Sequence, residues 1–269
     1  MEMKKKIIYV IGLVLALSSC SQYQKLLKST DNELKYKKAQ EYHNKGDYVR
    51  AYTLLEDVTA HYRGTPEAAP IQYLLADSYF GNKDYETAIN YYSSYVRNFP
   101  NGEQAMECSY MIGYCYYKIS PEPKLDQAAT HSGIAAFDTF LENYSYSERA
   151  TEAQKLKTEL EEKLAYKELL NARLYYKLGN YQGNNYQSSI IVSRNVLTEY
   201  PDTKYREEFA FLIVKSKYTE AQKSVASKKA DRYRNAMEEC EMFIANFPNG
   251  KYSKDAEKIL ADTKKQIKN

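Results

Sequence analysis

The sequence predicts an all-α fold, an α-solenoid of about five helix-turn-helix repeats. Glycine and proline are scarce, at 10 and 7 in 269 residues, which suits a helical protein. From Asp31 onward the pattern is helical and repeats itself. Each repeat ends in an aromatic residue followed by a turn signal, and Asn-Phe-Pro-Asn-Gly occurs at both 98–102 and 246–250. Such prolines and asparagines end one helix and let the next begin.

Two columns of residues keep the same register in every repeat. Each repeat ends in an aromatic residue, which is Tyr62 in the first repeat. The residue eleven positions before it is always small, and the residue four positions before it is always bulky. A small side chain lets two helices cross closely, and a bulky one fills the space beside the crossing. We therefore expect both columns to be buried. The small residues are Ala51, Ala88, Gly133, Ser189 and Ala236, and the bulky residues are Val58, Tyr95, Phe140, Val196 and Phe243.

The second repeat has the signature of a tetratricopeptide (TPR) unit. Its first helix carries Ala76 and Tyr79, and a Lys-Asp-Tyr turn follows at 83–85. Ala88 lies early in the second helix, and Pro100 ends the unit. Because TPR units stack as helix pairs, we expect ten main helices in one solenoid.

The repeats predict two halves of the chain. Residues 31–146 would hold units one to three, and residues 147–269 would hold units four and five with a capping helix over 253–269. A long charged helix, about 147–178, opens the fourth unit and would join the halves. Extra residues at 182–185 lengthen the turn that follows it.

The first 20 residues have the pattern of a lipoprotein signal sequence. Three lysines precede a short apolar run, Ile7 to Leu17, which is too short to span a bilayer. Leu17-Ser18-Ser19-Cys20 resembles the bacterial lipobox, whose cysteine is acylated. We expect cleavage of 1–19, a membrane lipid on Cys20, and a polar tether over 20–30. The alternative is an ordinary signal peptide or a short anchor, with Cys20 incidental.

Charge and motifs argue against nucleic-acid binding and catalysis. Removing the three lysines and one glutamate of the signal sequence leaves 35 basic and 34 acidic residues, a formal charge near +1. The histidines lack metal-ligand spacing, and no phosphate loop or nucleophile motif occurs. We expect no enzyme, no metal and no cofactor other than the covalent lipid. Cys108, Cys115 and Cys240 should be buried thiols without disulfides.

The concave face of a TPR array is the candidate binding site, because the first helices of the units line it. Tyrosine offers flat apolar area and one hydroxyl at low entropy cost, which suits a peptide-binding groove. The alternative is that these tyrosines only pack between helices. The consensus groove positions of the first three units are Tyr36, Gln40 and His43, then Tyr73, Asp77 and Phe80, then Tyr110, Tyr114 and Tyr117.

The mature chain resembles the BamD family, also called YfiO or ComL, the TPR lipoproteins of the β-barrel assembly machinery. The resemblance covers essentially the whole mature chain and depends on the lipobox together with the fourth unit. The extra residues after Tyr181 depart from the family. The segments that carry the resemblance are 125–127, 137–140, 162–169, 172–176, 179–181 and 196–203.

The resemblance implies that the protein is attached to the outer membrane by its lipid and faces the periplasm. It implies that the C-terminal units dock on a POTRA domain of the BamA subunit. It also implies that the N-terminal groove receives the C-terminal targeting strand of unfolded outer-membrane proteins. The sequence does not decide whether accessory lipoproteins join. Two other functions stay open: a lipoprotein that scaffolds cell-wall or other envelope proteins, and a glycan-capturing surface lipoprotein, which the lack of tryptophan disfavours.

Overall fold

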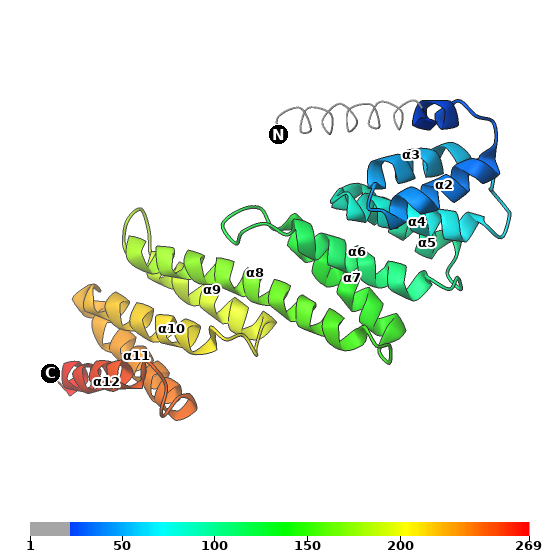
Figure 1. The fold of residues 1–269 in the computed structure, drawn as a ribbon. Helices are drawn as coiled ribbons and strands as arrows, with labels where there is room; N and C mark the ends of the chain where they lie inside the picture. The colour runs from blue at the N-terminus through cyan, green and yellow to red at the C-terminus, as the bar shows by residue number, and fades with distance from the viewer. Residues whose placement is uncertain (1–21, 269) are drawn as a thin grey trace, which may run out of the picture. The chain divides into compact units, whose positions relative to one another are not determined.

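The computed structural model describes residues 22–268, and the predicted all-α class with helix-turn-helix repeats is confirmed for them. The predictions for the signal sequence and for Cys20 lie outside these residues. From α2 onward the helices form five pairs and a closing helix, which can be followed in Figure 1. The pairs are α2 (Asn32–Asn44) with α3 (Tyr48–Thr59), α4 (Ala68–Gly81) with α5 (Tyr85–Asn98), α6 (Ala105–Ile119) with α7 (Ala128–Tyr144), α8 (Ala150–Leu178) with α9 (Asn185–Glu199), and α10 (Arg206–Gln222) with α11 (Ala226–Asn246); α12 (Ser253–Lys268) closes the chain.

Aspartates begin the helices that follow the tight turns. The side chains of Asp31, Asp47 and Asp84 cap α2, α3 and α5 by accepting a hydrogen bond from the backbone amide three residues later. Each such cap is worth about 1 kcal/mol. Gly46 precedes Asp47 in the left-handed conformation, with φ 75°, and Lys83 takes the same conformation before Asp84, with φ 64°. In the first two pairs, the turn signals read from the sequence therefore position the second helix.

Both predicted columns are buried, as expected. Ser189 shows why the small column matters, because its Oγ donates a hydrogen bond to the Ala172 carbonyl, 2.9 Å away, where α9 crosses α8. At a second close crossing, a Cβ added to Gly113 would lie 2.7 Å from a ring carbon of Phe137. Every residue of the two columns is buried: Ala51, Ala88, Gly133, Ser189, Ala236, Val58, Tyr95, Phe140, Val196 and Phe243.

The contacts divide the chain into two compact units. The N-terminal unit takes in residues up to 119 and 132–154, and the C-terminal unit takes in 120–131 and 155 onward. The division thus falls within α8, which begins at Ala150 and not at 147. The loop before α7 belongs to the C-terminal unit because α8 holds it. Lys163 Nζ donates to the Ser120 carbonyl at 3.2 Å, and Lys167 Nζ donates to the Leu125 carbonyl at 2.7 Å.

The segment ahead of α2 differs from the patternless tether that the sequence predicts. Residues 22–27 are helical. The Tyr23 ring packs edge-on against the Tyr42 ring, with 5.7 Å between centroids. Because Tyr23 and Tyr42 lie far apart in the chain, their contact produces no periodic pattern in the sequence near Tyr23. The docking of this segment could therefore not be predicted from the sequence pattern.

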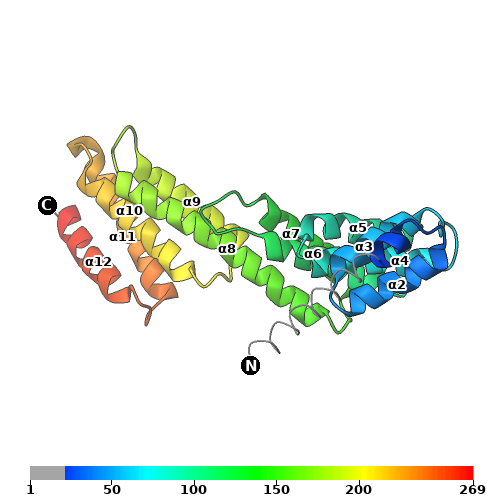
Figure 2. The same ribbon diagram turned by 45° about the horizontal axis from the view of Figure 1, so that its top comes forward.

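The closing helix α12 packs on the C-terminal unit. Ala256 is fully buried beside Cys240 and Phe243, and Ile259 and Leu260 pack against the same cluster. Figure 2 shows α12 running beside α11. Among the helices described, none combines the length and the apolar character needed to cross a membrane.

Candidate functional site

A hollow in the N-terminal unit brings together three of the predicted groove residues. Tyr36 and Gln40 on α2 and Tyr73 on α4 line a cavity of about 430 Å³. Burial raises the pKa of Tyr36, and it raises the pKa of Tyr73 to about 12. Both phenols therefore keep their protons at neutral pH and can donate hydrogen bonds to a ligand.

Four lining residues of this hollow were not among the predicted ones. Asn44 lies one helical turn beyond Gln40, and Pro70 lies one turn before Tyr73, so extending each predicted face by a turn would have found both. Gln104 precedes α6, where it accepts a hydrogen bond from Tyr95 at 2.9 Å. The full additional set is Asn44, Pro70, Leu74 and Gln104.

Aromatic rings continue from α4 onto α6. The centroid of the Phe80 ring lies 5.9 Å from that of Tyr114, and Tyr114 stacks on Tyr117 at 6.2 Å with an interplanar angle of 9°. All three side chains are partly exposed. Lys118 Nζ lies 5.7 Å from the centroid of the Tyr114 ring. We call the accessible rings of Phe80, Tyr114 and Tyr117 the aromatic row.

Tyr110 belongs to the core, so its prediction as a groove residue is wrong. It is 2% exposed, and its ring packs on Phe137 and Phe140 of α7. The Arg149 guanidinium, which pairs with Glu107 at 2.8 Å, lies 4.7 Å from the centroid of the same ring. The consensus position fails here because α7 and Arg149 cover the face of α6 that carries Tyr110.

His43 and Asp77 bind each other, which joins the first two repeats. His43 Nε2 lies 2.8 Å from Asp77 Oδ2, and the Tyr92 hydroxyl donates to Asp77 Oδ1 at 3.2 Å. The hydrogen bond to Asp77 raises the pKa of His43, although burial acts in the opposite direction. The pair therefore serves mainly to hold α2 against α4 beside the hollow.

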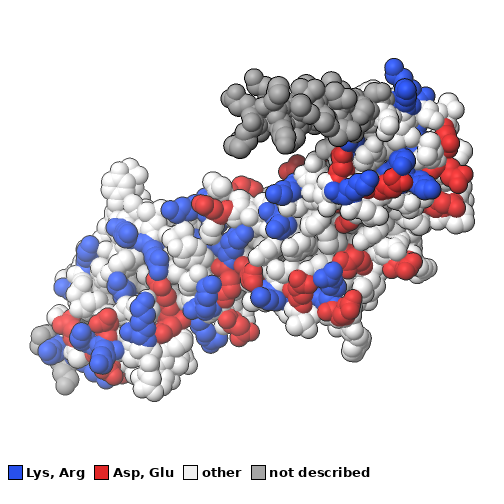
Figure 3. Space-filling view, viewed as in Figure 1, with Lys and Arg blue, Asp and Glu red and all other residues white. Residues whose placement is uncertain are grey.

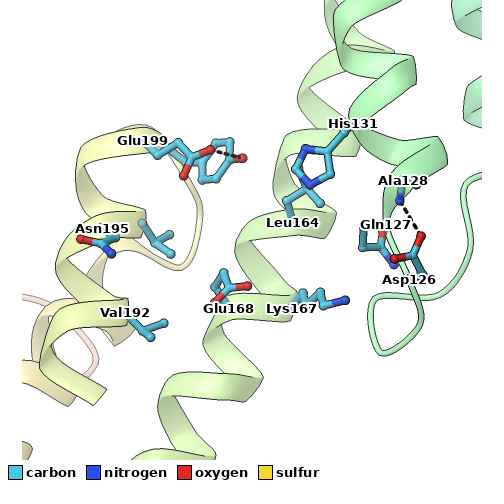
Figure 4. Close-up of a pocket in the computed structure, with 12 residues that line it drawn as sticks. Asp126, Gln127, Ala128, His131, Leu164, Lys167, Glu168, Val192, Asn195 and Glu199 are labelled. Carbon is cyan, nitrogen blue, oxygen red and sulfur yellow. Dashed lines mark hydrogen bonds between the residues drawn. The ribbon is translucent and has the colours of Figure 1, made fainter. Parts of the chain in front are cut away.

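A second cavity, of about 460 Å³, lies within the C-terminal unit (Figure 4). In this view Lys167 extends from α8 toward the loop that carries Asp126. Leu164, Val192 and Val196 supply apolar surface, while charged side chains surround it. One signal of this site could be seen in the sequence, the insertion before α7. The lining residues are Asp126, Gln127, Ala128, His131, Leu164, Lys167, Glu168, Val192, Asn195, Val196, Glu199 and Tyr200.

The described residues offer little reactive chemistry. Within residues 22–268, no group of three or more His, Cys, Asp or Glu side chains is placed to hold a metal ion. Cys108, Cys115 and Cys240 are buried free thiols, as predicted. Burial raises the pKa of each thiol to about 12. Among the features available for recognition are the two cavities described above and the aromatic row.

Known proteins match most of this chain. The putative outer membrane protein assembly factor BamD of Aquifex aeolicus is 27% identical over 209 residues, which cover 77% of this chain and 66% of that protein. BamD of Neisseria meningitidis serogroup B is 23% identical over 266 residues, covering 93% and 94%. BamD of Caulobacter vibrioides is 27% identical over 137 residues, covering 51% and 45%. The chain thus spans somewhat less than two thirds of the Aquifex protein and under half of the Caulobacter protein.

A solved structure and a family model complete the comparison. The TPR domain of P58(IPK) is 13% identical with a TM-score of 0.41, over 91% of this chain and 68% of that one. A family model described as outer membrane lipoprotein, YfiO, matches residues 28–208 and 178–268. Because this model spans nearly all the residues that the structure describes, the chain belongs to the YfiO family of outer membrane lipoproteins.

Proposed function

We propose that this chain is a lipid-anchored, periplasm-facing scaffold that takes part in the assembly of β-barrel proteins into the outer membrane. The match to the outer membrane lipoprotein family over residues 28–268 carries the proposal. Relatives along that length are named outer membrane protein assembly factors. Cys20, which ends the lipobox-like Leu-Ser-Ser-Cys, would carry the lipid.

The N-terminal unit would bind the C-terminal targeting segment of an unfolded barrel protein. Such a segment is extended and rich in aromatic side chains. The amides of Gln40 and Asn44 could pair with its main chain in the hollow, and the aromatic row could pack on its side chains. The partial exposure of Tyr36, Tyr73 and Tyr114 supports this assignment.

The C-terminal unit would dock on a POTRA domain of a BamA-like subunit. Its cavity is lined by the apolar Leu164, Val192 and Val196 and by charged side chains of both signs, among them Lys167, Glu168 and Glu199. Specific protein interfaces combine apolar and polar side chains in this way. The cavity is therefore the part of this unit to probe first.

Photo-crosslinking tests the groove. A benzophenone amino acid replaces Tyr36, Tyr73 or Tyr114, and the full chain is mixed with an unfolded barrel protein. We expect crosslinks that map to the last strand of the substrate. The matched control is Asn90, an exposed residue on α5, the second helix of its pair. Crosslinks equally strong at Asn90, or absent from all three groove sites, would count against peptide binding here.

Co-purification in mild detergent tests the partner. We expect a BamA-like barrel protein to be captured by the wild type and lost with Lys167→Glu. Lys228→Glu, on an exposed position of α11 in the same unit, should leave capture unchanged. Recovery of a cell-wall enzyme in place of a barrel protein would favour the rival function, a scaffold for envelope proteins.

A further inference from the structure

The segment that follows Cys20 in sequence is docked on the first repeat. The Arg50 guanidinium lies 5.2 Å from the centroid of the Tyr23 ring and 5.5 Å from that of Tyr42. The Tyr23 ring meets Tyr42 edge-on, 5.7 Å away. Cation–π and edge-to-face contacts of this kind hold the start of the segment beside the turn between α2 and α3.

Lys35 holds the other end of the segment. Its side chain is almost fully buried, and Nζ donates to the Leu27 carbonyl at 3.1 Å. The same ammonium group pairs with the Asp57 carboxylate on α3. A buried ammonium is tolerated only when acceptors surround it, so this link ties residue 27 to both α2 and α3. The segment is thus fastened at residues 23 and 27.

The proposed function places a lipid on Cys20, and the inference depends on that placement. Cys20 precedes Tyr23 by three residues. A chain spans at most about 3.6 Å per residue, so three residues reach roughly 11 Å. Because Tyr23 is held on the first repeat, the anchor keeps this repeat close to the membrane surface.

The surface beside the docked segment is basic. A hollow of about 510 Å³ between the segment and α2 is lined by Lys25, Lys38 and Lys45, with Glu41 as its one acid. Lys38 pairs with Glu41 at 2.7 Å. In Figure 3, basic side chains lie over α2 and over the segment ahead of it, with acidic side chains interspersed. We call Lys25, Lys38 and Lys45 the basic face.

We propose that the basic face docks on the anionic phospholipid headgroups of the membrane that holds the lipid anchor. Its charge is complementary to phosphate, and the short link to Cys20 gives it a high effective concentration at that surface. A lysine near an anionic membrane surface gains about fivefold in binding. The first repeat is then oriented by two contacts, the acyl chains and the lysines.

Lysine acetylation on vesicles tests the proposal. The full-length lipidated protein is reconstituted into vesicles of phosphatidylcholine alone, or of phosphatidylcholine with phosphatidylglycerol. Mass spectrometry follows the acetylation rate of each lysine. We expect the basic face to react about fivefold more slowly on the phosphatidylglycerol vesicles, and high salt should remove the difference. Lys228 and Lys254, exposed in the C-terminal unit, should react equally on both.

Two variants separate charge from docking. Lys25→Gln/Lys38→Gln/Lys45→Gln should abolish the protection of the exposed Lys28, whereas the matched Lys228→Gln/Lys254→Gln/Lys258→Gln should retain it. Tyr23→Ala frees the segment and should weaken the protection of Lys38 and Lys45. Circular dichroism of each variant confirms that the helices are intact.

The outcomes distinguish this inference from the proposed function. If the protein floats with the vesicles but its lysines are acetylated at equal rates on both lipids, membrane docking of the basic face is overturned, whereas the lipid anchor is retained. A protein that does not float would remove the anchor and the inference with it. Protection by inorganic phosphate on phosphatidylcholine vesicles would indicate a free-anion site, and equal protection of Lys228 would indicate general adsorption. Either result would overturn the proposal.

Discussion

His43 Nε2 lies 2.8 Å from Asp77 Oδ2, so the last turn of α2 is tied to the middle of α4. Asp77 also accepts a hydrogen bond from the buried Tyr92, which reaches it from α5. Three helices of the first two repeats thus converge on one carboxylate. The hollow that holds Tyr36 and Tyr73 lies between the same two first helices, α2 and α4. Its shape should therefore depend on the charge state of His43.

The stability of the N-terminal unit should depend on pH through His43. Its pKa is raised above 6.5 by the hydrogen bond to Asp77. The native state therefore binds the proton more tightly than the unfolded chain, so the contribution is complete below pH 6.5 and is lost as the pH rises through the folded pKa. We expect the difference in free energy of unfolding between wild type and His43→Gln to be larger below pH 6.5 than well above it.

Urea denaturation at several pH values measures this difference. His61→Gln is the control, because it removes a histidine whose side chain is exposed. A His43→Gln difference that stays constant with pH, or grows in alkaline solution, would contradict the assignment. An NMR titration of the His43 ring gives an independent check.

Replacing Gly113 with a larger residue should lower the stability of the protein. A Cβ there would lie 2.7 Å from Phe137 Cδ1, and the ring, which is fully buried, would have to shift within the core. Overpacking of this kind costs about 1–3 kcal/mol, which a gain in helix propensity of about 1 kcal/mol partly offsets. We expect Gly113→Ala to lower the free energy of unfolding by up to about 2 kcal/mol.

A double variant checks the cause. Phe137→Leu removes the ring that the new methyl group would meet. Gly113→Ala/Phe137→Leu should therefore lose less stability than the sum of the two single variants. Additive losses would mean that the ring contact is not the source of the penalty.

Thiol titration should distinguish the three internal cysteines from Cys20. Burial raises the pKa of Cys108, Cys115 and Cys240 to about 12, so their reactive thiolates are rare at neutral pH. An acylated Cys20 has no free thiol. We expect the native full-length protein to show no fast-reacting thiol and the unfolded protein to show three. One fast thiol that maps to Cys20 would contradict lipidation, and one that maps to Cys108 would contradict its burial.

The structural features that could be predicted from the sequence are those determined by residues close together in the chain. Asp47 and Asp84 cap helices through amides three residues away, and Ser189 lies in a register set by its own repeat, so a local pattern reveals them. Tyr110 could not be placed in this way, because Arg149 covers it from a distant part of the chain. Tyr23 escaped for the same reason, since Arg50 docks the segment that carries it.

The cavity of the C-terminal unit shows a further limit. Its lining combines the insertion before α7 with α8 and α9, and the course of an insertion depends on which side chains hold it. Here Lys163 and Lys167 hold it by binding its carbonyls. The sequence alone shows two lysines on a charged helix, which are usually solvated.

Glu220 should stabilise the turn that departs from the family pattern. Its carboxylate accepts hydrogen bonds from Asn184 at 2.6 Å and Gln187 at 2.5 Å, and it pairs with Arg232 at 3.1 Å, while only 6% of its side chain is exposed. Removing it takes away the acceptor that Asn184, Gln187 and Arg232 share, although the exposed Asn184 and Gln187 can then bond to water. We expect Glu220→Ala to cost about 1–2 kcal/mol.

Urea denaturation with hydrogen exchange tests this role. The loss should be accompanied by faster exchange of the amides at 182–187, since the turn is released. Glu238→Ala, at an exposed position of α11, should change stability by less than about 0.5 kcal/mol. Equal effects of the two substitutions would show that the turn does not depend on Glu220.

Peptide affinity should separate the ring of Tyr36 from its hydroxyl. If the hollow packs an aromatic targeting segment, Tyr36→Ala should weaken binding by about 1–2 kcal/mol, since the flat contact is lost. Tyr36→Phe keeps that contact and removes one donor, so a smaller loss of about 0.5–1.5 kcal/mol is expected. Asn90→Ala, on the second helix of its pair, should leave the affinity unchanged. Because Tyr36 also packs on Tyr62, 5.8 Å between centroids, each variant is first compared with wild type in urea. Unchanged affinity in a folded Tyr36→Ala would move the binding site away from this hollow and toward the aromatic row of Phe80 and Tyr114.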